Sequence, residues 1–199
     1  MNIRISDTGR IEEVLAFYYE VIDAIGNDVN SVRWTKDVYP SRQFLLEALG
    51  NGELMTGEEE GRIIAAMILN QNCSEEYGTV LWPLKAEPED VSVIHALAVH
   101  PEKRRNGYAR AMVQEALALA EENHRRAVRL DVLKGNTPAE ALYAGMGFVH
   151  VGTIPMYYED TGTAEFLLFE LPLSSGTEKT RRHSKSRRDL FCRKKEVDL

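Results

Sequence analysis

A loop at residues 103–110 places four basic side chains beside one glycine, directly before the clearest helical pattern of the chain. Backbone amides at a helix start bind phosphate oxygens, and Gly107 lets such a ligand approach the backbone closely. Basic residues at this end oppose the helix dipole and therefore favour a bound anion. The pattern predicts a phosphate-binding loop, although a solvated basic turn accounts for the same residues equally well. The spacing excludes a Walker A loop and a dinucleotide fingerprint, since no Gly-Lys-Ser/Thr and no three-glycine run is present.

Two further side chains could move protons. His95 is the only titratable residue in the interior of the apolar run 91–99, and alternation along a strand predicts that it shares a face with Leu97 and Val99. An imidazole there could accept a proton, or it could be a core histidine bonded to a neighbouring carbonyl. Tyr143 could donate a proton, or its ring could simply fill the core.

Periodicity predicts the elements that must position these residues. Helical spacing of apolar residues predicts helices over 11–25, 41–49 and 106–123. A capping box, Thr137-Pro138-Ala139-Glu140, predicts a fourth helix that starts at residue 137 and ends near Gly147. Alternating or β-branched runs predict strands at 2–6, 53–58, 62–69, 91–99, 128–133, 148–154 and 165–171. The fold class is therefore α/β (α+β), with helices covering a sheet of mixed direction and a parallel crossover over 91–133.

The composition is that of a globular domain with a basic end. The chain has 199 residues, of which 44% are hydrophobic and 28% are charged. Residues 174–199 hold nine Lys+Arg against four Asp+Glu, whereas the rest of the chain holds 15 against 27, a net charge of −12. We therefore expect one domain at 1–173 and a basic, flexible tail at 174–199. The acidic body argues against nucleic acid as a partner, except through the tail, and fits cationic partners better.

Nothing in the sequence indicates a membrane, a metal or secretion. The longest apolar run, 63–69, is too short to span a bilayer, and the N-terminus lacks an apolar signal core. The cysteines, Cys73 and Cys192, have no metal-ligand spacing. We expect a cytoplasmic protein that uses no metal.

The basic loop and a second block together resemble the GNAT superfamily of acetyl-CoA-dependent N-acetyltransferases. The family pattern Gln/Arg-x-x-Gly-x-Gly/Ala stands here as residues 104–109, Arg-Arg-Asn-Gly-Tyr-Ala, after a Val-His-Pro at 99–101. The pattern Asn-x-x-Ala-x-x-Leu-Tyr-x-x-x-Gly-Phe stands at 136–148, with the second alanine one position late. The two blocks occur in the family's order, and the resemblance covers residues 2–173. It implies a GNAT-like, largely antiparallel sheet of about seven strands, with a splayed central parallel pair and about four helices.

The resemblance also implies roles for the residues of both blocks. The backbone of 97–99 would pair with the pantetheine arm of acetyl-CoA, and the amides of 105–110 would hold its pyrophosphate. A backbone N–H near Leu97 or Ala98 would face the developing oxyanion, and Tyr143 would protonate the departing thiolate. Asn136 would lie beside the cofactor, or it could simply end a strand. The implied cofactor-binding residues are Leu97, Ala98, Val99, Arg104, Arg105, Asn106, Gly107, Tyr108, Ala109, Arg110, Asn136 and Tyr143.

The general base departs from the commoner family pattern. Many members carry a glutamate on the strand before the loop, but residues 91–100 of this chain contain no carboxylate. His95 is therefore the leading candidate, and the core-histidine interpretation stands beside it. The weaker candidates are Glu53, Glu58 and Asp90. We predict Tyr143 and His95 as the catalytic residues.

The resemblance places the acceptor between the early helices and the last hairpin. The candidate acceptor-binding residues are Trp34, Tyr39, Tyr157 and Tyr158, with Glu159 and Asp160 nearby. Aromatic rings and carboxylates together suit a cationic amine, although each residue alone could be an ordinary packing or turn residue.

The sequence therefore predicts an N-acetyltransferase that moves an acetyl group from acetyl-CoA to a primary amine of a small molecule or a peptide N-terminus by direct attack. A non-catalytic CoA-binding sensor or interaction module on the same fold is the alternative. A nucleic-acid adaptor that acts through the tail is a third interpretation. A homodimer is left open as an assembly.

Overall fold

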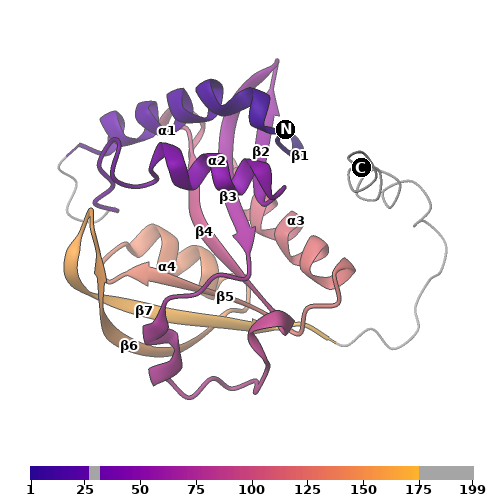
Figure 1. The fold of residues 1–199 in the computed structure, drawn as a ribbon, viewed down its shortest axis with the longest axis vertical. Coiled ribbons are helices and arrows are strands. Elements are labelled where there is room, and N and C mark those ends of the chain that lie inside the picture. Colours follow the sequence, from indigo (N-terminus) through magenta and orange to yellow (C-terminus); the bar gives the residue numbers. More distant parts are fainter. Residues whose placement is uncertain (27–31, 175–199) are drawn as a thin grey trace, which may run out of the picture.

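The computed structural model describes residues 1–26 and 32–174, and these form one seven-stranded sheet with four α-helices (Figure 1). The predicted tail lies outside the described residues except for its first residue. The strands are β1 (Asn2–Ile5), β2 (Leu54–Glu59), β3 (Arg62–Asn70), β4 (Val91–Val99), β5 (Ala127–Leu133), β6 (Val149–Tyr158) and β7 (Gly162–Pro172). The helices are α1 (Ile11–Ile25), α2 (Arg42–Gly50), α3 (Tyr108–Glu122) and α4 (Thr137–Ala144).

The strand order, β1-β2-β3-β4-β5-β7-β6, confirms the predicted mixed sheet. All neighbours are antiparallel except β4 and β5, which form the predicted parallel pair. This pair is joined only from Val91 opposite Ala127 to Val93 opposite Arg129. Beyond that point the two strands separate, so the middle of the sheet opens into a wedge.

Helices cover both faces of the sheet, because each carries one apolar stripe. α1 and α2 lie side by side (Figure 1) and bury Tyr18 and Leu45 in one core cluster with Ala96 of β4. α3 buries Met112 in a second cluster with Ile94, on the opposite face. In the described part of the chain, no helix is both long enough and apolar enough to cross a membrane.

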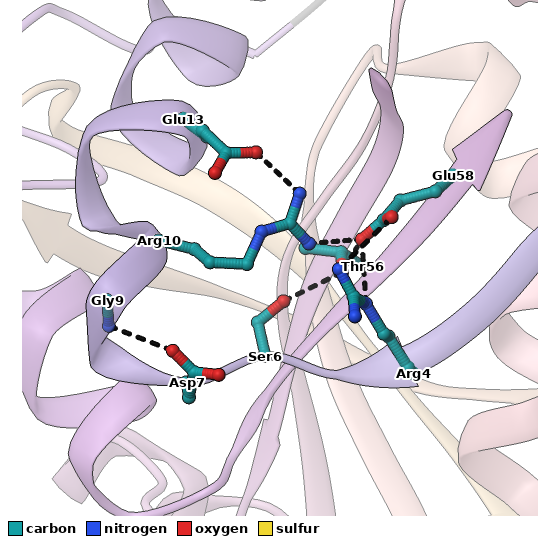
Figure 2. A network of polar contacts seen from close by, with 8 residues as sticks. All are labelled: Arg4, Ser6, Asp7, Gly9, Arg10, Glu13, Thr56 and Glu58. Atoms are coloured by element: carbon teal, nitrogen blue, oxygen red, sulfur yellow. Dashed lines mark hydrogen bonds and ion pairs between the residues drawn. The ribbon is translucent and has the colours of Figure 1, made fainter. Parts of the chain in front are cut away.

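A network of polar side chains joins β1, β2 and the start of α1 (Figure 2). Arg4 donates to both carboxylate oxygens of Glu58, at 2.9 and 3.2 Å, and Arg10 forms a second ion pair with the same carboxylate. Ser6 and Thr56 share a hydrogen bond of 2.8 Å beside it. Burial alone would raise the pKa of Glu58, but hydrogen bonds from the two arginines outweigh burial and hold that pKa below its usual range. The structure thus commits this weaker candidate base to two ion pairs.

The β3–β4 connection, residues 71–90, is a long segment that contains only two short 3₁₀ helices. A buried ion pair fixes it to the sheet: Arg129 Nε donates to Glu170 at 3.0 Å, and the same guanidinium lies 4.1 Å from the centre of the Trp82 ring. These residues, called here the Arg129–Glu170 clamp, hold the connection where the buried ring of Tyr77 packs against β5.

Many predicted boundaries differ from the observed ones by one or two residues, and two differences concern a helix cap and the length of a hairpin. The N-cap of α4 is Asn136 rather than Thr137, and the Asn136 carboxamide oxygen accepts from the Ala139 amide at 3.4 Å. The capping-box glutamate is still used, since Glu140 accepts from Gly135 N at 2.9 Å. The last hairpin is longer than predicted, because β6 and β7 continue pairing up to the turn at 159–161.

Candidate active site

A cavity of about 340 Å³ lies where β4 and β5 separate. This volume suits a small ligand or the reacting end of a larger one. Residues from β4, β5, α4, the last hairpin and the segment before α2 line it together. The lining residues with polar side chains and predicted or possible chemical roles are His95, Asp131, Asn136, Tyr143, Tyr158 and Asp160.

The predicted phosphate loop leads into α3 with the geometry that an anion needs. Arg105 and Gly107 both have positive φ, +65° and +80°, which turns successive amides of the loop. The first helical donor is Ala111, whose amide bonds to Gly107 O at 3.0 Å. The amides of 108–110 therefore have no partner among the described residues, and no side chain caps the helix. This backbone fits a diphosphate such as that of CoA.

The side chains of the loop divide into anchors and free charges. Asn106 donates to the carbonyls of Lys103 and Arg104, at 3.2 and 3.3 Å, and so holds the turn. The guanidinium groups of Arg104 and Arg105 are exposed, which leaves their charges accessible to an anion.

Three other side chains of this region bind protein groups. Lys103 Nζ lies 2.8 Å from Glu59 at the end of β2, and the hydroxyl of Tyr108 donates to the same carboxylate. Arg110 donates to Gly145 O at 3.3 Å and ties α3 to the end of α4. The side chains of Tyr108 and Arg110 thus stabilise the loop, and the cofactor role predicted for them rests on their backbone amides.

The edge of β4 that faces β5 is unpaired beyond Val93. Ala98 and Val99 bond only to β3 on their other side, and Leu97 lines the cavity. An unpaired edge of this kind can accept an extended ligand as an added strand. It is the feature that the predicted contact between residues 97–99 and the pantetheine arm requires.

A β-bulge in β4 overturns one prediction about His95. β4 carries one more residue than β3 at this point, and Ala96 takes a φ of +51° while its carbonyl accepts from Tyr18 Oη at 2.8 Å. The bulge interrupts the alternation of the strand. His95 therefore faces the α1–α2 side with Ala96, whereas Leu97 and Val99 pack with the α3 side. The prediction of a face shared with Leu97 and Val99 was wrong.

His95 lies in the cavity wall with its Nε2 already engaged. Nε2 is 2.9 Å from Asn72 O and 3.0 Å from Asn70 Oδ1. Both partners are acceptors, so Nε2 carries the proton and Nδ1 keeps the lone pair. Burial lowers the pKa of His95 to about 4, against a smaller opposite effect of the bond to Asn72. The imidazole is thus neutral at pH 7, and its role as a base stays a prediction.

Tyr143 projects from α4 into the same cavity. Its ring contacts Phe148 and Phe169 at centroid distances of 5.4 and 6.4 Å, and its side chain is only 5% exposed. Burial, together with the negative charge of Asp131, raises the pKa of the phenol. No described residue accepts a hydrogen bond from this hydroxyl. The ring therefore packs as a core aromatic does, while its proton is available to a ligand.

The structure brings three of the four predicted acceptor residues together. Trp34, Tyr39 and Tyr158 line the cavity, and the rings of Trp34 and Tyr39 lie 5.9 Å apart. Tyr157 lies outside it, with 66% of the residue exposed, because alternation along β6 turns Met156 and Tyr158 inward. The structure therefore does not support Tyr157 as an acceptor-binding residue.

Sequence reasoning missed Asp131, which lies on β5 in the cavity wall. Its Oδ1 accepts from Tyr77 Oη at 2.9 Å and from Tyr158 Oη at 3.2 Å. Burial raises the pKa of this carboxyl despite the two phenol hydrogen bonds. Burial likewise raises the pKa of Asp160, which also lines the cavity. The available signal was the charge pattern of the strand, since Arg129 and Asp131 alternate within an otherwise apolar run.

The Acetyltransferase (GNAT) family model matches residues 19–148, and the chain belongs to this family. Residues 19–148 therefore form an acetyltransferase domain of this family. The match includes both blocks that carried the resemblance.

Solved structures share the fold at low sequence identity. A GNAT family acetyltransferase from Streptococcus agalactiae has a TM-score of 0.71 and 20% identity, over 89% of this chain and 96% of that chain. The Salmonella typhimurium protein yncA, solved with its cofactor acetyl-CoA, has a TM-score of 0.66 and 13% identity, over 92% and 99%. The ribosomal-protein-S18-alanine N-acetyltransferase of Escherichia coli has a TM-score of 0.61 and 19% identity, over 90% and 97%.

An uncharacterized protein of Mycobacterium leprae is 35% identical over 75 residues, which is 38% of this chain. The chain spans only 20% of the length of that relative.

Proposed function

We propose that the protein transfers an acetyl group from acetyl-CoA to a primary amine of a small molecule or a peptide N-terminus, by direct attack of the amine. The observation that carries this proposal is the cavity at the β4–β5 wedge. It brings the unpaired edge of β4, the free hydroxyl of Tyr143 and an acidic, aromatic wall into one space. Acetyl-CoA supplies the activated acetyl thioester.

Each part of the site has a role in this reaction. The amides of 108–110 and the charges of Arg104 and Arg105 hold the diphosphate, and the edge of β4 orients the arm that carries the thioester. A backbone N–H near Leu97 stabilises the charge that develops on the carbonyl oxygen. Tyr143 donates its proton to the sulfur that leaves, and the raised pKa keeps that proton on the phenol until then.

The acceptor enters from the side of the cavity lined by Trp34, Tyr39 and Tyr158. Aromatic faces and nearby carboxylates stabilise a cation, which is the form of a primary amine at neutral pH. A peptide N-terminus has additional support, because the E. coli neighbour is named for a ribosomal-protein alanine. His95 remains the base predicted from the sequence.

Thiol release from acetyl-CoA tests this function directly. The purified protein is incubated with acetyl-CoA and, in turn, propylamine, spermidine, glycinamide and alanyl peptides, and products are identified by mass spectrometry. Amine-dependent thiol release with an acetylated product supports the proposal. Tight binding of acetyl-CoA without turnover of any amine would favour the non-catalytic CoA-binding module.

A further inference from the structure

We propose that Asp131 binds the ammonium group of the acceptor and accepts its proton, and that Tyr77 and Tyr158 are the positioning residues that aim this carboxylate. The proposal rests on the acetyl transfer proposed above. It deepens that function by defining the acceptor as an amine that enters as a cation.

The hydrogen bonds of Asp131 leave one oxygen for a ligand. Both phenols donate to Oδ1, and no side chain of the described residues donates to Oδ2. Asp131 is partly exposed, so its carboxylate can be reached from the cavity. Because Asp131 lines the cavity, the accessible oxygen is offered to whatever the cavity holds.

The charge of Asp131 also lacks a partner. None of the ion pairs between described residues includes it. A shielded carboxylate without a countercharge favours a bound cation or a proton. The raised pKa of the carboxyl expresses the same preference, and it makes Asp131 a stronger proton acceptor than an ordinary aspartate.

The groups around the cavity make it acidic. The titratable and charged side chains that line it are Arg33, Tyr39, Cys73, His95, Asp131, Tyr143, Tyr158 and Asp160, and Tyr77 reaches Asp131 from outside the lining. His95 is neutral at pH 7, and Arg33 is mainly exposed. Two carboxylates therefore outweigh one peripheral cation, which selects a positively charged acceptor.

The two phenols fix the direction of the carboxylate from two separate parts of the fold. Tyr77 comes from the 71–90 connection, which the Arg129–Glu170 clamp holds, whereas Tyr158 comes from the end of β6. Their hydrogen bonds lower the pKa of Asp131 against the effect of burial. The phenols thus keep the carboxylate ionised enough to bind a cation.

The proton and electron balance needs no further reactant. Asp131 takes one proton from the ammonium, which frees the nitrogen lone pair. A nitrogen–carbon bond then forms to the acetyl carbonyl carbon, the carbon–sulfur bond breaks, and Tyr143 gives its proton to the sulfur. The nitrogen then gives a second proton to the Tyr143 phenolate, which restores the phenol. Asp131 releases its proton to solvent. The products are the amide, CoA thiol and one proton.

Asp131→Asn is the first test, because the amide keeps an oxygen for both phenols and removes only the charge. The fastest amine of the panel above is used as the probe. We expect kcat/KM to fall about 100- to 10,000-fold, the range of a general base. We also expect loss of the acidic limb of the pH–kcat/KM profile, a limb that stays at the same pH for acceptors of different basicity. A variant within tenfold of wild type that keeps this limb would overturn the proposal, as would loss of the limb in His95→Gln alone.

The positioning role has a test that a structural role would not pass. Each phenol hydrogen bond lowers the pKa of Asp131, so Tyr77→Phe and Tyr158→Phe should each move the fixed limb to higher pH. Tyr157→Phe, on the same strand but outside the cavity, is the matched control and should leave the limb in place. If the limb moves in neither Tyr77→Phe nor Tyr158→Phe, the positioning role of the phenols is contradicted.

A measurement without acceptor separates this inference from the proposed function. Carbon-13 NMR of aspartate-labelled protein follows each carboxyl, and the signal that Asp131→Asn removes is assigned to Asp131. This signal should titrate above the ordinary aspartate range and move higher in Tyr77→Phe. Titration in the ordinary range refutes the inference even if amines are acetylated. A raised titration in a protein that acetylates no amine refutes the proposed function instead.

Discussion

Two shielded carboxylates, Glu58 and Asp131, have opposite environments. Glu58 receives hydrogen bonds from two guanidinium groups, and its pKa is held below the usual range. Among the side chains of the described residues, only two neutral phenols donate to Asp131, and burial raises its pKa. Among the described residues, two arginines supply the countercharge of Glu58, whereas no basic side chain forms an ion pair with Asp131.

The difference shows how to separate a structural charge from a functional one. A carboxylate whose countercharge is built into the fold stabilises that fold. A carboxylate that is shielded without a countercharge reduces stability, and this cost is compatible with use by a ligand. The residue type alone does not distinguish the two, because the arginines near Glu58 come from β1 and the start of α1, far from it in sequence.

Tyr143→Phe should lower turnover strongly on the cavity side of the comparison, next to the loss expected for Asp131→Asn. It removes one hydroxyl and keeps the ring packed between Phe148 and Phe169. We expect kcat to fall about 10- to 1,000-fold with little change in the affinity for acetyl-CoA, as for loss of an acid. Steady-state kinetics and donor titration check this. Wild-type kcat, with chemistry shown to limit turnover, would return Tyr143 to a core-packing role.

Glu58→Gln should act on stability and not on activity. It removes a charge that two guanidinium groups share, and it should lower the free energy of unfolding by about 2 kcal/mol. Asp131→Asn, the matched variant, should cause no loss at pH 7, since its charge has no partner to lose. Urea unfolding at equilibrium measures both. If Asp131→Asn is the more destabilising of the two, the comparison fails.

Gly107→Ala tests the predicted phosphate loop before α3, which is expected to bind acetyl-CoA. Gly107 and Gly61 share a φ of +80°, and a Cβ at either would meet no atom within 4 Å. Both substitutions should therefore cost about 1 kcal/mol of stability through backbone strain. Only Gly107→Ala adds a methyl group where the diphosphate approaches, so only it should weaken acetyl-CoA binding, by about tenfold. Calorimetric titration of both variants checks this, and equal affinities would remove the loop assignment.

The smallest expected effect concerns the pH dependence of stability. The charges of Glu58 and Asp131 should change the free energy of unfolding in opposite directions. The pKa of Glu58 is lower when folded, so its contribution is complete above the unfolded value of about 4.3 and is lost as pH falls through the folded value. The pKa of Asp131 is raised when folded, so its charge opposes folding at neutral pH, and this effect disappears as pH falls below about 3.9. The difference in the free energy of unfolding between each variant and wild type should thus shrink in acid. At neutral pH, Glu58→Gln should be less stable than wild type, and Asp131→Asn should be equally or more stable. Unfolding measured from about pH 3 to 7 records both.

Periodicity and the two sequence blocks predicted most of the fold. Local rules determine these features, because apolar stripes define α1 and α3. Ser41 caps α2, and its Oγ accepts a hydrogen bond from Phe44 N at 3.2 Å. The same blocks also predicted a loop before α3 and a helix that carries Tyr143, and both elements are observed.

The parts that failed depend on contacts between distant segments. Ala96 gives no sequence signal for a positive φ, so the bulge that turns His95 could not be predicted from alternation. Asp131 lies in a strand that its apolar neighbours make look buried, and its importance depends on Tyr77 and Tyr158, which are 54 and 27 residues away. Tyr157 and Tyr158 have the same residue type, and only the register of β6 with β7 decides which one faces the cavity.

The most direct test of the central claim is a paired measurement on Asp131→Asn. Acetyl transfer from acetyl-CoA and the free energy of unfolding are recorded on the same preparation, beside Glu58→Gln. The account predicts that Asp131→Asn loses at least about 100-fold in kcat/KM and keeps wild-type stability. Glu58→Gln should show the reverse. An active Asp131→Asn, or one that loses activity only because it loses its fold, would contradict the claim that the cavity charge is reserved for the acceptor.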